Sequence, residues 1–175
     1  MLLLVDTSAF VAFISFCNVW MDEFEFSWRQ LSKSLLLEVT RCSGTEKKLD
    51  ESLLPALCCH FGRTVLLDAF ELIDANALRK HVSPSGKEII EVQEEGYHFY
   101  LFPSSNYCSC PTFREEVTKK RQLVCSHVAA VWLANALNRI DDVVECSNFT
   151  LSTMMSSMAL SESESALNTN RPVEQ

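Results

Sequence analysis

Two short pairs of residues with metal-binding side chains lie in the second half of the sequence. Cys108 and Cys110 form the first pair, Cys125 and His127 form the second, and a charged spacer of 14 residues separates them. Thiol and imidazole groups serve as disulfide partners, metal ligands or catalytic groups, depending on their surroundings. The pairs therefore allow a disulfide, a bound metal or a Cys-His dyad, and the rest of the sequence has to distinguish these.

Cysteine usage and the N-terminal sequence favour a metal over a disulfide. The chain has eight cysteines, an even number that would suit the disulfide framework of a short secreted protein. The first 24 residues are apolar, but they include Asp6, and no Lys or Arg precedes Arg29. A signal peptide needs a positive start, and a membrane span needs about 20 residues largely free of charge. We therefore expect neither, and we expect a reducing compartment, in which paired Cys and His more often bind a metal.

Composition indicates one compact domain. The chain has 175 residues, of which 47% are apolar, with only four glycines and five prolines. Such a chain buries a core of its own and is neither fibrous nor disordered throughout. The net charge of -8 argues against a free-standing nucleic-acid-binding protein, because phosphate contacts need clustered Lys and Arg. Any basic surface must be local.

Apolar periodicity predicts helices in the first half of the chain. Residues 27–42 have a helical spacing, and residues 50–74 read as a helix broken at Gly62. The apolar positions are expected to be core and are given no chemistry. They are Leu31, Leu35, Leu36 and Val39, then Leu53, Leu54, Leu57 and Phe61, and then Leu66, Leu67, Phe70 and Ile73.

The spacing of apolar residues changes from helical to strand-like in the second half of the chain. Residues 77–82, 87–92 and 97–102 read as three short strands joined by turns, which form a meander that leads into the first cysteine pair. His81 and His98 lie in these strands, and we expect them on the solvated face. Residues 126–140 predict a helix, and the polar residues 161–175 predict a disordered tail. The fold class is therefore α+β, a small single domain with N-terminal helices, an antiparallel β-meander and a zinc-linked C-terminal helix.

These elements bring the two pairs together. Cys108 and Cys110 are expected at the end of the third strand, where side chains two apart point to one face. Residues two apart within a helix diverge by about 200°, so Cys125 must precede the first helical turn, with Ser126 as a candidate N-cap. The strand end and the helix start then present two ligands each to one ion.

Three thiolates and one imidazole suit tetrahedral zinc, and a complete set of four protein ligands favours one structural zinc ion over a catalytic one. The zinc deaminase pattern H-x-E with P-C-x-x-C is absent. A nucleophilic dyad is disfavoured, because Cys125 and His127 are too close in sequence for their side chains to meet easily. The plain alternative is that these are ordinary buried cysteines.

The motif C-x-C, a variable spacer and C-x-H resembles the SWIM zinc finger. Ala130, three residues after His127, matches the extended form C-x-C…C-x-H-x-x-A of the SWIM subunit of the Shu complex, as do the stretches VSPSGKEIIEV and YCSCPTF. The resemblance covers roughly residues 30 to 160. Residues 1–28 match nothing in that family, and we expect them to be an unassigned apolar N-terminal extension. We further expect a helical region at 29–76, the SWIM zinc finger domain at 77–145, and a short amphipathic segment with a disordered polar tail at 146–175.

The resemblance implies a nuclear, non-enzymatic subunit of a hetero-oligomer. Shu-complex SWIM subunits pair with a RecA-like recombinase paralogue and help the recombinase assemble on single-stranded DNA during homologous recombination. The chain has no phosphate-binding loop, so an ATP site would belong to a partner. The alternative is a stand-alone DNA-binding module.

Two further groups of residues are candidates for contacts with other molecules. The spacer's basic residues would contact nucleic acid, although a solvated loop is the plain alternative. The apolar residues after His127 are spread over more than one face of the expected helix. They would bind a partner, although packing in the chain's own core is the plain alternative. The nucleic-acid candidates are Arg114, Lys119, Lys120 and Arg121, and the partner-binding candidates are Ala130, Trp132, Met154, Met155 and Met158.

Overall fold

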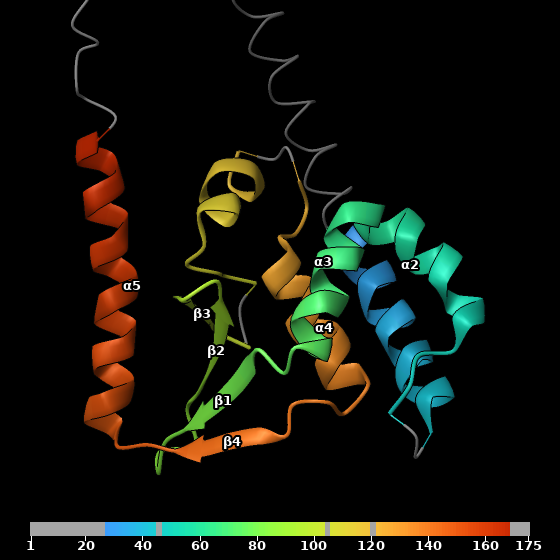
Figure 1. Cartoon of the computed structure of the whole chain (residues 1–175), viewed down its shortest axis with the longest axis horizontal. Coiled ribbons are helices and arrows are strands. Elements are labelled where there is room, and N and C mark those ends of the chain that lie inside the picture. The colour runs from blue at the N-terminus through green and yellow to red at the C-terminus, as the bar shows by residue number, and fades with distance from the viewer. Residues whose placement is uncertain (1–26, 45–46, 104–105, 120–121, 169–175) are drawn as a thin grey trace, which may run out of the picture.

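The computed structural model describes residues 27–44, 47–103, 106–119 and 122–168 (Figure 1). Its elements confirm an α+β chain in which a helical region precedes a small sheet. The predicted apolar extension lies almost wholly outside the described residues, and its last two residues, Ser27 and Trp28, are already helical. Within the described ranges, no helix combines the length and the apolar character that crossing a membrane requires.

The N-terminal region consists of helices, as predicted. Residues 27–43 are helical, and the chain continues through a 3-10 turn η1 (Glu51–Leu53) into α2 (Leu54–Phe61) and α3 (Arg63–Asp74). The side chain of Asp50 caps η1 by accepting the Ser52 backbone N–H at 2.9 Å. Gly62 separates α2 from α3 with φ 85°, a left-handed value that glycine adopts without strain. The predicted break is therefore confirmed.

The predicted meander is present, and a fourth strand joins it. The strands β1 (Leu78–Val82), β2 (Glu88–Glu94) and β3 (Tyr97–Leu101) pair antiparallel in sequence. The short strand β4 (Asp142–Glu145) pairs parallel to β1, which gives the order β3-β2-β1-β4. The sequence did not predict β4, because its four exposed residues carry no alternating apolar pattern. The ion pair between Arg79 and Asp142, at 2.6 Å, supports the register in which β4 pairs with β1.

The helices of the second half differ in their ends from the prediction. α4 (Ser126–Ala136) is shorter than residues 126–140, since Asn138, with φ 52°, takes the left-handed conformation that commonly ends a helix. The N-cap is Cys125 rather than Ser126. The segment expected as a charged loop contains the π-helical turn η2 (Phe113–Val117).

The last helix, α5 (Asn148–Asn168), extends into the segment for which a disordered tail was predicted. The prediction is wrong for residues 161–168, and residues 169–175 lie outside the described part of the chain. Helix formation is cooperative, so the packed first turns allow a polar sequence to continue the same helix.

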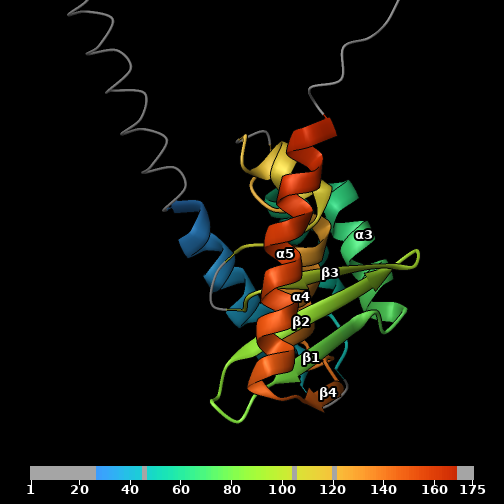
Figure 2. The ribbon, with the colours of Figure 1, turned by 90° about the vertical axis from the view of Figure 1, so that its left-hand side faces the viewer.

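Helices cover both faces of the sheet (Figures 1 and 2). The main core lies on the face toward the N-terminal helices and α4, where Ile90 and Val92 of β2 are buried. A smaller cluster lies on the other face, where Leu151 and Met158 of α5 pack near Ile89. Most predicted core positions are buried or half-buried, but Leu31 and Leu67 are 52% and 51% exposed. These two predictions are wrong, because helical spacing alone does not show how wide a face its neighbours cover.

Candidate metal centre

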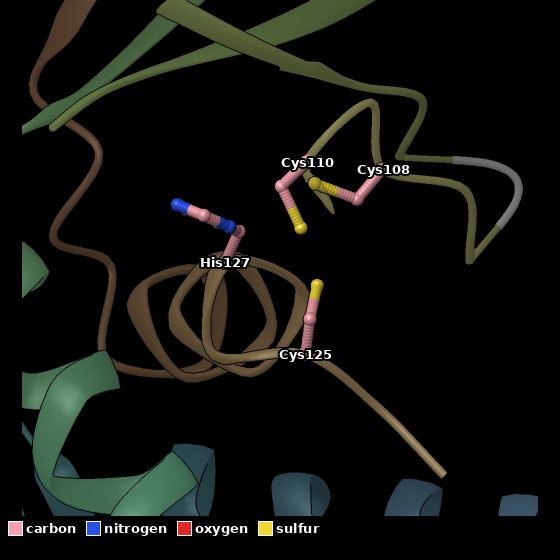
Figure 3. A group of neighbouring side chains, drawn as sticks. All are labelled: Cys108, Cys110, Cys125 and His127. Atoms are coloured by element: carbon pink, nitrogen blue, oxygen red, sulfur yellow. The ribbon is translucent and has the colours of Figure 1, made fainter. Parts of the chain in front are cut away.

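The four side chains predicted to bind a metal meet at one buried point. One ligand atom from each of Cys108, Cys110, Cys125 and His127 lies within 4.8 Å of the others, and all four residues are buried. Figure 3 shows the three sulfur atoms converging from two separate chain segments, with His127 beside them. The two pairs therefore form one cluster.

The first cysteine pair is held against the edge strand β3. The sequence placed the pair at the end of that strand, but β3 ends at Leu101, and the chain turns back so that Cys108 pairs antiparallel with Leu101. The Ser109 N–H donates to the Tyr100 carbonyl at 3.1 Å, and the Tyr100 N–H donates to Ser109 Oγ at 2.9 Å. These two bonds fix the residue between the cysteines, so both thiols are positioned by the sheet.

The second pair is positioned by the start of α4. Cys125 is extended (φ -86°, ψ 163°) as the N-cap, and its carbonyl accepts the first helical hydrogen bond from Ala129, at 3.1 Å. The prediction that Cys125 precedes the first turn is confirmed. Because the backbone changes conformation between Cys125 and His127, their side chains reach one point, which a continuous helix would forbid.

Backbone N–H groups support the sulfur atoms. The Phe113 N–H donates to Cys110 Sγ at 3.2 Å. The Val128 backbone N–H hydrogen-bonds Cys125 and works against the net rise in the pKa of that thiol. Hydrogen bonds to sulfur favour the thiolate form, which is the form that binds a metal.

His127 has one nitrogen bound to a carboxylate and the other facing the cysteines. Its Nε2 hydrogen-bonds Glu94 Oε2 at 3.1 Å, and its ring lies 4.7 Å from the ring of Phe99. Its Nδ1 is buried and makes no hydrogen bond. A buried polar atom without a partner is costly, and a metal ion among the sulfur atoms would satisfy it. Glu94 would then orient the ligand through its second nitrogen, as carboxylates do in zinc sites.

The three thiols of the cluster have widely separated pKa values. Burial raises the pKa of the Cys108 thiol far above its usual range. Hydrogen bonds with Cys108 and Cys125 lower the pKa of Cys110 well below its usual range. Cys108 works to lower the pKa of Cys125, but Cys110 and burial outweigh it and raise that pKa to about 12. The Cys108 and Cys125 thiols therefore favour the thiolate form of Cys110.

The protonation of His127 depends on the same thiolate. Burial works to lower the pKa of His127, but the neighbouring Cys110 sulfur and Glu94 outweigh it, so the pKa is raised. The Cys110 sulfur and the His127 imidazole therefore each favour the charged form of the other. A divalent cation would replace this arrangement of protons with one central charge.

The donor set defines the class of protein. Three sulfur atoms and one imidazole nitrogen, buried and convergent, match the Cys3His set of structural zinc sites. The chain is thus a small α+β protein in which a cluster suited to zinc joins a sheet edge to a helix start.

Comparison with known proteins supports the resemblance to SWIM zinc fingers. The chain is 29% identical over 110 residues to the mouse zinc finger SWIM domain-containing protein 7, an alignment that covers 62% of this chain and 72% of that protein. It is 28% identical over 107 residues to the human protein of the same name, and that alignment covers 60% of this chain and 76% of the human protein. No protein-family model matches the chain, and no solved structure matches it significantly. The predicted resemblance is confirmed, because the chain is similar to two proteins that are named for a SWIM zinc finger.

The candidate nucleic-acid residues do not form one described surface. Arg114 is half-buried in η2, and Lys119 is exposed just after it. Lys120 and Arg121 lie outside the described residues. The role of the four residues stays a prediction.

The candidate partner residues differ in accessibility. Ala130 is fully buried and Met158 is 4% exposed, so both pack inside the chain. Trp132 is half-buried, with ring centroids 6.0 Å from Trp28 and 6.3 Å from Phe61. Met154 is half-buried and Met155 is 42% exposed, which leaves Met155 the most accessible of the five.

Sequence reasoning missed a buried ionic group on the sheet. Glu91 on β2 accepts hydrogen bonds from His81 Nε2 at 2.8 Å and from His98 Nδ1 at 2.7 Å. His81 is only 6% exposed, so its prediction as a solvated residue is wrong. The cause is α5, which covers this face of the sheet and which the sequence did not place there. Glu94 was missed for a similar reason, because it lies 33 residues from His127 in the sequence.

Proposed function

We propose that this protein is a non-enzymatic subunit of a Shu-type complex, which holds one structural zinc ion and promotes recombinase filament assembly on single-stranded DNA during homologous recombination. It would act in the nucleus as part of a hetero-oligomer with a RecA-like recombinase paralogue. The observation that carries the proposal is the closed, buried set of Cys108, Cys110, Cys125 and His127, which matches the SWIM motif residue by residue.

The geometry of the cluster supports a structural role. Four protein ligands leave no coordination position for a substrate or an activated water, which catalytic zinc sites keep. The cluster connects the β3 edge to the start of α4, and α4 packs against α3 in the core. Zinc would therefore lock the sheet to the helical half of the molecule, so that metal binding stabilises the surfaces that partners recognise.

Charge supports action through partners rather than tight DNA binding by this chain alone. The net charge of the chain is -8. Among the basic residues of the spacer that the structure describes, Lys119 has an exposed side chain. At most a few phosphates would be neutralised, so the isolated chain should bind single-stranded DNA weakly and with a shallow salt dependence. The alternative function, a stand-alone SWIM DNA-binding module, predicts the opposite. Titration of a labelled oligothymidine at several salt concentrations separates the two functions.

The zinc itself is tested by elemental analysis of the purified full-length protein. We expect about one zinc ion per chain. Cys110→Ala should lose the ion and melt at a much lower temperature, because structural zinc contributes ~10–16 kcal/mol to the folding of zinc-finger peptides. Cys59→Ala is the matched control, since Cys59 is exposed on α2. A zinc content well below one ion in the folded wild type would refute the metal assignment.

The complex is tested in the native cell. The tagged wild-type chain should co-purify with a RecA-like paralogue, the Cys110→Ala variant should recover much less of it, and the Cys59→Ala variant should recover as much as the wild type. If zinc is present but no such paralogue co-purifies, the zinc assignment stands and the Shu-type function is wrong.

A further inference from the structure

The strand β4 forms one edge of the sheet. Within the described part of the chain, the order β3-β2-β1-β4 gives β4 a paired strand on one side, which is β1. Figure 1 shows β4 at the lower rim of the sheet. Every residue from Asp142 to Glu145 is exposed, so the edge is accessible. The backbone N–H and C=O groups at such an edge can pair with a strand of another chain.

The register of β4 shows which of its backbone groups face outward. The Cys146 N–H donates to the Val82 carbonyl at 2.9 Å, so Cys146 points its N–H toward β1. Successive residues of a strand direct their backbone groups to opposite sides, so Val144 also faces β1. The N–H and C=O groups of Val143 and Glu145 therefore face away from the sheet, where a further strand would bind them.

Exposed apolar side chains are concentrated beside this edge. Val143 is 55% exposed and Val144 is 36% exposed. Phe149, in the first turn of α5, is 81% exposed. Single exposed apolar residues are normal, but a group of them next to outward-facing strand backbone is typical of a surface that binds protein.

The carboxylates near the edge do not exclude a second copy of the chain. Asp142 forms an ion pair with Arg79 at 2.6 Å, and Asp141 forms one with Lys47 at 2.6 Å. Both carboxylates are therefore balanced by cations of the same chain, which reduces the repulsion between two copies that approach through β4.

The sequence of β4 is complementary to itself in one antiparallel register. Pairing centred on Val144 sets this residue opposite the partner's Val144, and β-branched side chains form favourable cross-strand pairs. It sets Val143 opposite the partner's Glu145, so that the outward backbone groups of both residues meet as a hydrogen-bonded pair. Asp142 then lies opposite the partner's Cys146, and no two carboxylates face each other directly.

Neighbouring registers lack this complementarity. Centring the pair on Val143 would set Asp141 opposite the partner's Glu145, and centring it on Glu145 would set two copies of that residue opposite each other. Like charges directly opposite each other are destabilising. A slip by one residue would oppose outward backbone groups to groups already bound to β1, so the hydrogen bonds could not form.

We propose that two copies of this chain associate through β4, antiparallel and centred on Val144, so that their sheets join into one continuous sheet. A two-fold axis makes both copies use the same surface, as in most symmetric dimers. The proposal goes beyond the function above, since the partner is a second copy of this chain and not a recombinase paralogue.

Sedimentation of the purified full-length protein over a range of concentrations tests for the dimer. Val143→Pro should weaken dimerisation at least tenfold, because proline removes an outward N–H and leaves the bonds between β4 and β1 in place. Val143→Thr is the matched control, since it keeps the N–H and the β-branched shape, and its dimerisation should stay within twofold of the wild type. Thermal unfolding of both variants should resemble that of the wild type.

A cysteine at the two-fold axis tests the register without depending on the proline variant. Residues opposite each other in a non-hydrogen-bonded pair have Cα atoms about 4.5 Å apart, which a disulfide can bridge. Val144→Cys should therefore form a covalent dimer under mild oxidation, in clearly higher yield than the wild type with its native cysteines. Val143→Cys should not exceed the wild type, because its two copies would lie diagonally and beyond the roughly 7 Å limit for a disulfide.

Three results would overturn the proposal. A chain that sediments as a monomer at every concentration would leave the edge to another occupant. A dimer that persists in a folded Val143→Pro variant would place the contact elsewhere on the molecule. Cross-linking of Val143→Cys as efficient as that of Val144→Cys would contradict the register centred on Val144.

Discussion

Replacing Glu94 by glutamine tests how the protein orients its histidine ligand. Glu94 Oε2 is 3.1 Å from His127 Nε2, and the substitution keeps the size of the side chain but removes its charge. Loss of such a carboxylate partner typically lowers metal affinity by about 10–100-fold. The Glu94 side chain is 42% exposed, so water competes for the same contact, and we expect the lower end, about tenfold.

This loss of affinity sets the expected change in stability. When free zinc is well above its dissociation constant, a tenfold weaker affinity lowers the free energy of unfolding by about 1.4 kcal/mol. In excess chelator, the variant and the wild type should instead unfold almost alike, because the exposed carboxylate then contributes little. The effect should therefore depend on the metal.

The assay is competition for zinc against a coloured chelator, together with thermal unfolding with and without zinc. Glu95→Gln is the control, since it removes the same charge one residue away on the exposed turn after β2. If Glu94→Gln binds zinc as tightly as Glu95→Gln, Glu94 does not orient the ligand. If it lowers the melting temperature equally in chelator, Glu94 acts on the fold instead of on the metal.

Three further predictions concern protons and the backbone. The raised pKa values of Cys108 and Cys125 keep both thiols protonated at neutral pH. Zinc binding should therefore release about two protons or more, and the affinity for zinc should increase as the pH rises. Calorimetry in buffers of different ionisation enthalpy measures the number of protons released. Burial works to raise the pKa of the Glu91 carboxyl, but hydrogen bonds with His81 and His98 outweigh burial and lower this pKa below its usual 4.5. The ionised carboxylate therefore stabilises the folded chain above pH 4.5, and this stabilisation is lost as the pH falls through the pKa of the folded state. Glu91→Gln should flatten the decline in melting temperature below pH 4.5, and an unchanged decline in acid would contradict this prediction. Gly62→Ala should destabilise the chain by about 1 kcal/mol or more in urea unfolding, because φ is 85° although the space is open, and a neutral effect would show that the break between α2 and α3 tolerates strain.

The elements that carry the site were predictable because their signals are local. The strands around His81 and His98 alternate at period two, the helix after His127 has helical spacing, and turn residues separate them. The ligand set followed from residue types and spacing, since C-x-C and C-x-H each place two donors within reach of one ion. The end of α4 was not predictable from apolar spacing, because the left-handed Asn138 ended the helix while apolar residues continued to Ile140.

The sequence by itself determined the four candidate ligands, the helix-then-meander order and the break at Gly62, because each depends on neighbours a few residues apart. Tertiary structure alone decided the contacts between distant segments. It turned the chain back after Leu101 so that Cys108 pairs with the strand, brought Glu94 to His127 across 33 residues, and laid α5 over a sheet face that the alternating pattern had left to solvent. Such contacts depend on which surfaces remain to be buried once the local elements have formed, and a single sequence pattern does not record that competition.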